Sequence, residues 1–204
     1  MMRFFPRRLA VVTLGACLIL VGGCASTQPT RFYVLTSLPD SVKEEEAGRA
    51  KWGVAIGVGP VDLPRYLDRP QIVTRTSRNE LDLAEFDQWA EPLKDNFSNV
   101  LAENLSILIP TDRIAVFPWN RSTPIDYRVA VEVTRFEAKT GGNASLVARW
   151  SILGKDGKKV LLRKKSSFSE SAKTREYKAT VSAMNRTLED LSREIAKAIK
   201  AISK

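Results

Sequence analysis

The residues that carry most enzyme chemistry are sparse in this sequence. It contains no histidine, and its two cysteines, Cys17 and Cys24, lie close to the N-terminus. Nucleophilic catalysis by a Ser–His or Cys–His pair therefore lacks its base, and a zinc site of the usual Cys/His kind lacks its ligands. Carboxylates are the remaining candidates for acid–base work.

Four carboxylates lie close together in the sequence: Asp82, Glu85, Asp87 and Glu91. Asp82 alternates with leucines, which is typical of the solvated face of a strand. Glu91 precedes Pro92, where the start of a helix favours negative charge. Both positions have a structural explanation. We therefore expect no enzyme activity, no catalytic pair, no metal and no cofactor.

Three glycines, Gly53, Gly57 and Gly59, resemble a nucleotide-binding loop only faintly. The fingerprint needs a strand, a glycine turn and then a helix, whereas Pro60 follows here. Close backbone packing within a strand explains these glycines better, so ATP binding is not expected.

The N-terminus combines a basic start, an uncharged apolar stretch over residues 9–21, and two glycines before Cys24. This pattern is typical of a secretory signal, and the apolar stretch is too short to span a membrane. The run from Leu20 to Cys24 resembles the lipobox of bacterial lipoproteins, whose cysteine is acylated. The sequence therefore predicts a removed signal (1–23) and a lipidated Cys24. An ordinary secretory signal with an incidental thiol is the alternative.

The residue after the cysteine is Ala25 rather than aspartate. By analogy with lipoprotein sorting, this resembles an address for the outer membrane. We expect a lipidated tether (24–30) and a single periplasmic domain (31–204). Nucleic acid is not an expected partner, because export separates the domain from it.

The alternation and spacing of apolar residues predict strands, a helix, strands and a second helix. The helices are expected between Pro92 and Pro110 and over 177–202, with an Asp156–Gly157 hairpin turn between two late strands. The fold class predicted is α+β, an antiparallel or mixed sheet with two helices packed on one face. A proline-rich loop is expected over 60–70, and strands over 31–36, 52–58, 72–76, 81–86, 114–119, 127–134, 144–153 and 160–169.

Basic residues concentrate around the late hairpin, and contact with anionic lipid head groups or an acidic partner is one hypothesis for them. A solvated turn and a lysine-protected edge strand form the alternative. The residues are Lys155, Lys158, Lys159, Arg163, Lys164 and Lys165.

Several segments together resemble the ABC-type transport auxiliary lipoprotein family. They are RFYVL (31–35), VGPVDLPRYLDRPQIV (58–73), WAEPL (89–93) and VFPW (116–119). The resemblance implies a non-catalytic outer-membrane subunit of an intermembrane lipid-transport system. It implies as partner a PqiB-like MCE-domain protein, or the permease or substrate-binding subunits of an ABC transporter. A structural lipoprotein that docks an envelope complex without touching lipid is the alternative, and self-association into a homo-oligomer stays open.

The segment over 58–73, called the proline-rich block below, is the surface expected to bind the partner. Prolines lower the entropy cost of fixing a loop, and tyrosine and arginine are enriched at binding hot spots. Alternatively, the block covers the sheet with Tyr66 and Leu67 buried. The predicted contact residues are Leu63, Pro64, Arg65, Tyr66, Asp68 and Arg69.

Overall fold

The computed structural model describes residues 28–39, 41–42, 45, 53–120 and 122–203, so the predicted signal and Cys24 lie outside the described residues. The elements in chain order are β1 (Arg31–Tyr33), β2 (Ile56–Asp62), the 3-10 turn η1 (Arg65–Leu67), β3 (Gln71–Arg75), β4 (Leu81–Trp89), α3 (Leu93–Leu108), β5 (Ile114–Val116), β6 (Tyr127–Lys139), β7 (Asn143–Leu153), β8 (Val160–Ser171) and α4 (Tyr177–Ile202).

The described strands form one mixed eight-stranded sheet organised around the long strand β6. On one side, β7 pairs antiparallel with β6, and β8 pairs antiparallel with β7. On the other side, β2 runs parallel to the first half of β6 and carries β5 at its outer edge. Strand β3 joins the far end of β6 and is followed outward by β4 and β1.

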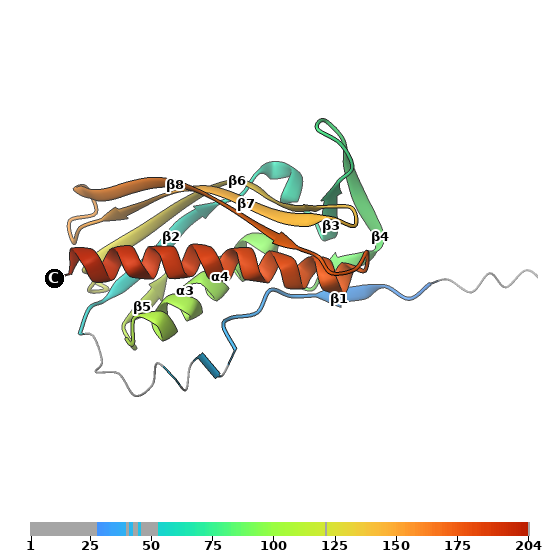
Figure 1. Ribbon diagram of the computed structural model, residues 1–204. Coiled ribbons are helices and arrows are strands. Elements are labelled where there is room, and N and C mark those ends of the chain that lie inside the picture. The colour runs from blue at the N-terminus through green and yellow to red at the C-terminus, as the bar shows by residue number, and fades with distance from the viewer. Residues whose placement is uncertain (1–27, 40, 43–44, 46–52, 121, 204) are drawn as a thin grey trace, which may run out of the picture.

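Both helices cover one face of this sheet (Figure 1). Helix α3 packs on β2 and β5, whereas α4 lies along β7 and β8 and also contacts α3. Fully buried residues join the layers: the rings of Phe97 on α3 and Phe136 on β6 meet edge to face, 5.2 Å between centroids. The mixed sheet and the two packed helices confirm the predicted fold class.

Helix α4 aligns antiparallel with β8 along its length. Arg186 Nε lies 2.9 Å from Glu170 Oε2, and Glu194, two turns later, contacts Lys164. The end of α4 therefore lies beside the start of β8, and the beginning of α4 lies beside the end of β8. At 1.5 Å per residue, the 26 residues of α4 separate these two ends by about 39 Å.

Most predicted elements are confirmed, and α4 has the predicted limits. The predicted strand over 52–58 is wrong in position, because β2 spans Ile56–Asp62 and includes Pro60. The register between β2 and β6 shifts between Val58 and Val61, so the ladder does not need the backbone donor that proline lacks. The strands predicted over 31–36 and 114–119 are shorter, ending at Tyr33 and Val116.

Candidate functional site

The N-terminal segment, residues 34–38, lies against the helix pair and is held there by asparagine side chains. The backbone N–H of Leu35 donates to Asn96 Oδ1 at 2.6 Å, and Asn96 Nδ2 donates back to the Leu35 carbonyl at 3.3 Å. The N–H of Leu38 donates to Asn104 Oδ1 at 2.8 Å. Both asparagines belong to α3 and are buried. These bonds replace the sheet hydrogen bonds that the segment lacks.

Helix α4 completes this arrangement. Asn185 accepts a hydrogen bond from the Thr36 N–H at 3.2 Å and donates to the Thr36 hydroxyl at 2.8 Å. Ser192 accepts from Asn104 Nδ2 at 3.1 Å, which joins the two helices beneath the segment. The chain next to the predicted tether is therefore fixed to both helices.

An ion pair fixes strand β1 at the same end of the molecule. Arg31 contacts the buried carboxylate of Asp87 through Nε and Nη2, at 2.9 Å each. The Tyr33 hydroxyl donates to Asp87 Oδ1 at 2.7 Å. Burial and the hydrogen bond to Asp87 raise the pKa of Tyr33 to about 12. Asp87, one of the four carboxylates considered for acid–base work, thus binds β1 to β4.

The proline-rich block divides into an inward and an outward part. Leu63 and Tyr66 are half-buried and pack against the core, while Leu67 is buried. Pro64 and Arg69 are also half-buried, whereas Arg65 and Asp68 are exposed. The predicted loop is therefore built differently from the expectation, because it begins with strand β2 and contains the turn η1. Docking by its exposed residues stays a prediction.

A buried carboxylate, Glu137, holds the inward part in place. The Tyr66 hydroxyl donates to Glu137 Oε2 at 2.7 Å, and Arg75 Nε donates to Oε1 at 2.7 Å. Arg135 Nε lies 3.3 Å from Oε1, and the Phe136 N–H donates to Oε2 at 3.2 Å. Burial and the hydrogen bond to Glu137 raise the pKa of Tyr66. This network (the Glu137 cluster) compensates the cost of burying the charge.

The predicted basic hairpin does not form a single surface. Successive residues of a strand point to opposite faces, so Lys164 turns to α4 and contacts Glu194. Arg163 and Lys165 lie on the outer face of the sheet, opposite Ser151 and Arg149 of β7. Lys158 and Lys159 are in the turn, where their backbone N–H groups donate to Asp156 Oδ1 at 2.9 and 3.0 Å. These hydrogen bonds lower the pKa of the Asp156 carboxyl. Lys155 is exposed in the same turn.

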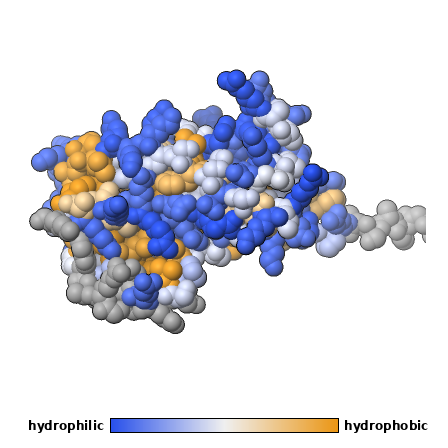
Figure 2. Space-filling view, viewed as in Figure 1, coloured by the Kyte–Doolittle hydropathy of each residue, from blue (hydrophilic) through white to orange (hydrophobic). Residues whose placement is uncertain are grey.

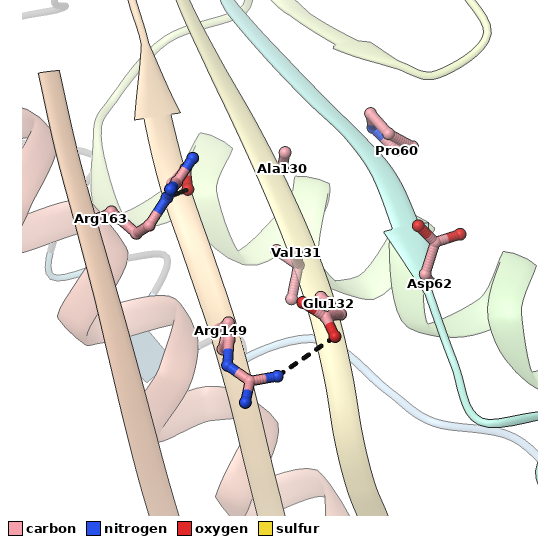
Figure 3. A pocket seen from close by; sticks show the side chains of 8 residues that line it. Pro60, Asp62, Ala130, Val131, Glu132, Arg149 and Arg163 are labelled. Carbon is pink, nitrogen blue, oxygen red and sulfur yellow. Dashed lines mark hydrogen bonds and ion pairs between the residues drawn. The ribbon is translucent and has the colours of Figure 1, made fainter. Parts of the chain in front are cut away.

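A hollow of about 380 Å³ lies on the outer face of the sheet (Figure 3). Its lining mixes both charges: Arg149 pairs with Glu132 at 3.2 Å, and Arg163 Nε donates to Ser151 Oγ at 3.3 Å. Asp62 at its rim pairs with Lys94 at 3.4 Å. The hollow presents paired charges and the hydroxyl of Ser151, which suit polar contact with a partner.

A second hollow, of about 340 Å³, lies between β2, β5 and α3, beside the half-exposed ring of Phe117. Gly59 passes this ring at φ +122°, and a Cβ there would lie 2.6 Å from Phe117 Cβ. A Cβ on Gly57 would lie 2.8 Å from Ile125 Cδ1. Close packing therefore explains both glycines, as predicted, while Gly53 has no atom within 4 Å of the position of a Cβ.

The four neighbouring carboxylates are not brought together. Asp82, Glu85 and Glu91 are exposed, and Asp87 is occupied by Arg31 and Tyr33. Within the described part of the chain, no three acidic, cysteine or histidine side chains are grouped as metal ligands would be. Among the described helices, none combines the length and the apolar character of a membrane span.

Two features of the site could not be recognised from the sequence. Asn96 and Asn104 are eight positions apart on α3. Their place beside the apolar residues of the helix was the only signal in the sequence that they are buried. Glu137 lies two positions after Arg135 in a long strand, and its partners Tyr66 and Arg75 are 71 and 62 positions away.

These observations define a small α+β domain whose N-terminal segment is bound to its helices and whose surface hollows carry mixed charge. The chain belongs to the family described as ABC-type transport auxiliary lipoprotein component, which matches residues 33–196. The match includes β2, the proline-rich block and most of α4.

Individual relatives are more distant. The chain is 25% identical over 142 residues to the intermembrane transport lipoprotein PqiC of Escherichia coli K12, covering 70% of this chain and 72% of PqiC. The same values hold for PqiC of Shigella flexneri. A Xanthomonas campestris protein of known structure has the same fold, with a TM-score of 0.66 and 16% identity over 85% of this chain and 96% of its own. An uncharacterized protein of known structure gives a TM-score of 0.68 and 20% identity over 84% and 99%.

Proposed function

We propose that this protein is a lipid-anchored periplasmic subunit of an intermembrane lipid-transport system. The observation that carries the proposal is the family match over residues 33–196, together with the similarity to a relative named as an intermembrane transport lipoprotein. Residues 1–23 serve as the signal, Cys24 is acylated at the outer membrane, 24–30 form the tether and 31–204 form the periplasmic domain. The subunit docks a PqiB-like MCE-domain protein or an ABC transporter and helps to maintain the envelope.

The charged hollows and the fixed proline-rich block support docking rather than lipid carriage by the domain itself. Arg65 and Asp68 are exposed on a loop whose inward side is held by the Glu137 cluster. A loop fixed before binding loses little conformational entropy when a partner arrives. These two residues therefore form the contact surface within the block.

Co-purification of the acylated protein from envelope extracts, followed by mass spectrometry, tests the docking role. The double variant Arg65→Ala with Asp68→Ala is expected to keep the wild-type melting temperature and to lose the transport partner. The matched control, Glu189→Ala with Arg193→Ala, also removes one acid and one base, but from α4, and should retain the partner. A block variant that still recovers the transport partner in full would contradict the assignment.

The alternative is an assembly lipoprotein that docks an envelope complex without touching lipid. A photoactivatable phospholipid added to the purified complex separates the two roles. Crosslinks within residues 31–204 would favour direct lipid handling, whereas crosslinks confined to the partner would favour assembly. Cys24→Ala should release the domain from the membrane, and an unmodified thiol on the mature wild-type protein would refute the anchor.

A further inference from the structure

Two exposed apolar side chains follow directly after the predicted tether. Phe32 is 64% exposed and Val34 is 43% exposed. Tyr33 between them points inward, where its hydroxyl donates to Asp87, and Leu35 after them is buried. This alternation puts Phe32 and Val34 on the outer side of a segment whose inner side is fixed to the domain. Neighbouring exposed apolar groups add to one surface patch, and such patches are used in contacts with membranes or proteins.

Apolar surface is also present at the other end of the molecule. Val160, at the start of β8, is 44% exposed, nearly the same fraction as Val34. Figure 2 shows apolar surface at the end where α4 terminates, and a smaller patch beside the point where the N-terminal trace leaves the domain. Exposure alone therefore does not decide which end meets a membrane.

The length of the chain between Cys24 and β1 decides which end of the domain meets the membrane. Seven residue steps separate Cys24 from Arg31, and they span at most about 25 Å when fully extended. Strand β1 lies near the beginning of α4, because Arg31 and its partner Asp87 are close enough for their charges to act on Tyr177, the first residue of the helix. Thr36, three residues after β1, is bonded to Asn185 in the first half of the helix. Val160 lies beside the end of α4, which is about 39 Å away.

We infer that Phe32 and Val34 enter the interface of the membrane that holds Cys24, so that the domain stands on its β1 end. This inference rests on the acylation of Cys24 in the proposed function. The occupant of the patch is the head-group region of that bilayer, where an aromatic ring and a valine gain from leaving water. The Val160 end then points away from the membrane, toward the periplasm, with Lys155, Lys158 and Lys159 beside it.

The cysteine content of the chain makes the test specific. Cys17 leaves with the predicted signal and Cys24 is acylated, so a newly introduced cysteine is the only free thiol. Val34→Cys and Val160→Cys place an environment-sensitive NBD label at two sites of equal exposure at opposite ends. Each labelled, acylated protein is inserted into phosphatidylethanolamine–phosphatidylglycerol vesicles with and without brominated chains.

The label at position 34 should fluoresce more strongly in vesicles and should be quenched by brominated lipid several-fold more than the label at position 160. Equal quenching at both positions would overturn the inference, because the domain would then lie flat or stand free. A label at position 34 that is shielded from water but not quenched would also overturn it, and would assign the patch to a second copy of this chain or another protein.

A second arm separates this inference from the anchor. Residues 24–204 with Cys24→Ser and an N-terminal hexahistidine tag are held on nickel-chelating lipid, and the same two labels are compared. Preferential quenching at position 34 in this arm, together with an unmodified Cys24 in the native protein, would refute acylation but retain the membrane contact. No preference in this arm, with Cys24 acylated, would refute the contact alone.

Discussion

The phenol oxygen of Tyr66 lies 2.7 Å from Oε2 of Glu137, a residue 71 positions further along the chain. Through this bond the proline-rich block is attached to the sheet at a buried carboxylate that two arginines also contact. The proline-rich block is therefore both part of the fold and the place where a partner is proposed to bind. Substitutions of its inward-pointing side chains should change stability, whereas substitutions of its exposed side chains should change partner binding.

Tyr66→Phe removes only the inward hydrogen bond. Because the acceptor is charged and buried, the free energy of unfolding should fall by about 1.5–3 kcal/mol, measured by urea denaturation. Tyr127→Phe is the matched control, since Tyr127 is half-buried on β6 and its hydroxyl makes no hydrogen bond within the described part of the chain. Equal stability of the two variants would show that Tyr66 acts by packing alone.

Glu137→Gln tests the Glu137 cluster itself. The substitution leaves the positive charge of Arg75 inside the domain without its carboxylate, which should cost about 3–5 kcal/mol. Glu132→Gln on the same strand breaks an ion pair whose side chains are more than half exposed, and should change stability by about 1 kcal/mol or less. Similar melting temperatures for the two variants would contradict the structural role of Glu137.

Asn96→Ala should loosen the N-terminal segment. It leaves the buried N–H and carbonyl of Leu35 without partners, so stability should fall by about 1–3 kcal/mol. The exchange of the Leu35 amide with deuterium should accelerate, as seen by NMR. Asn99→Ala, at an exposed position one turn later on α3, should leave that exchange unchanged. Unaltered protection of Leu35 in the Asn96 variant would show that the segment is held by other contacts.

The pKa of Tyr33 gives a pH dependence with a definite sign. The folded-state pKa is raised from 10.0 to about 12, so the protonated phenol favours the folded state. Its contribution is complete below pH 10 and is lost as the pH rises toward 12. Absorbance at 295 nm should show wild-type titration extending above pH 10 until unfolding, and Tyr33→Phe should lose part of that late component. An unchanged titration curve would exclude Tyr33 as its source.

The sequence predicts local structure where one face of an element is buried. The apolar spacing of α4 gives its limits, and Asp156–Gly157 gives the β7–β8 hairpin, because both signals act between neighbouring residues. The limits of β2 could not be predicted, since Pro60 is tolerated only because the register shifts there. The Glu137 cluster depends on tertiary contacts across more than sixty residues. By contrast, strand alternation alone predicts that Arg163 and Lys165 lie on the opposite face of β8 from Lys164, so this arrangement could have been predicted from the sequence.

The hydrogen bonds of residues 34–38 have a mechanical consequence. If Cys24 is the anchor, as proposed, any pull that a bound partner exerts on the domain must reach it through this segment and β1. The hydrogen bonds between β1 and β4 run across the strand direction, so a load along the tether acts on that ladder in shear. The Arg31–Asp87 pair and the bonds to Asn96 and Asn104 hold the same stretch of chain. Bonds loaded in shear break together rather than one after another. The tether to the proposed anchor therefore leaves the domain at a point where its bonds resist a pulling force.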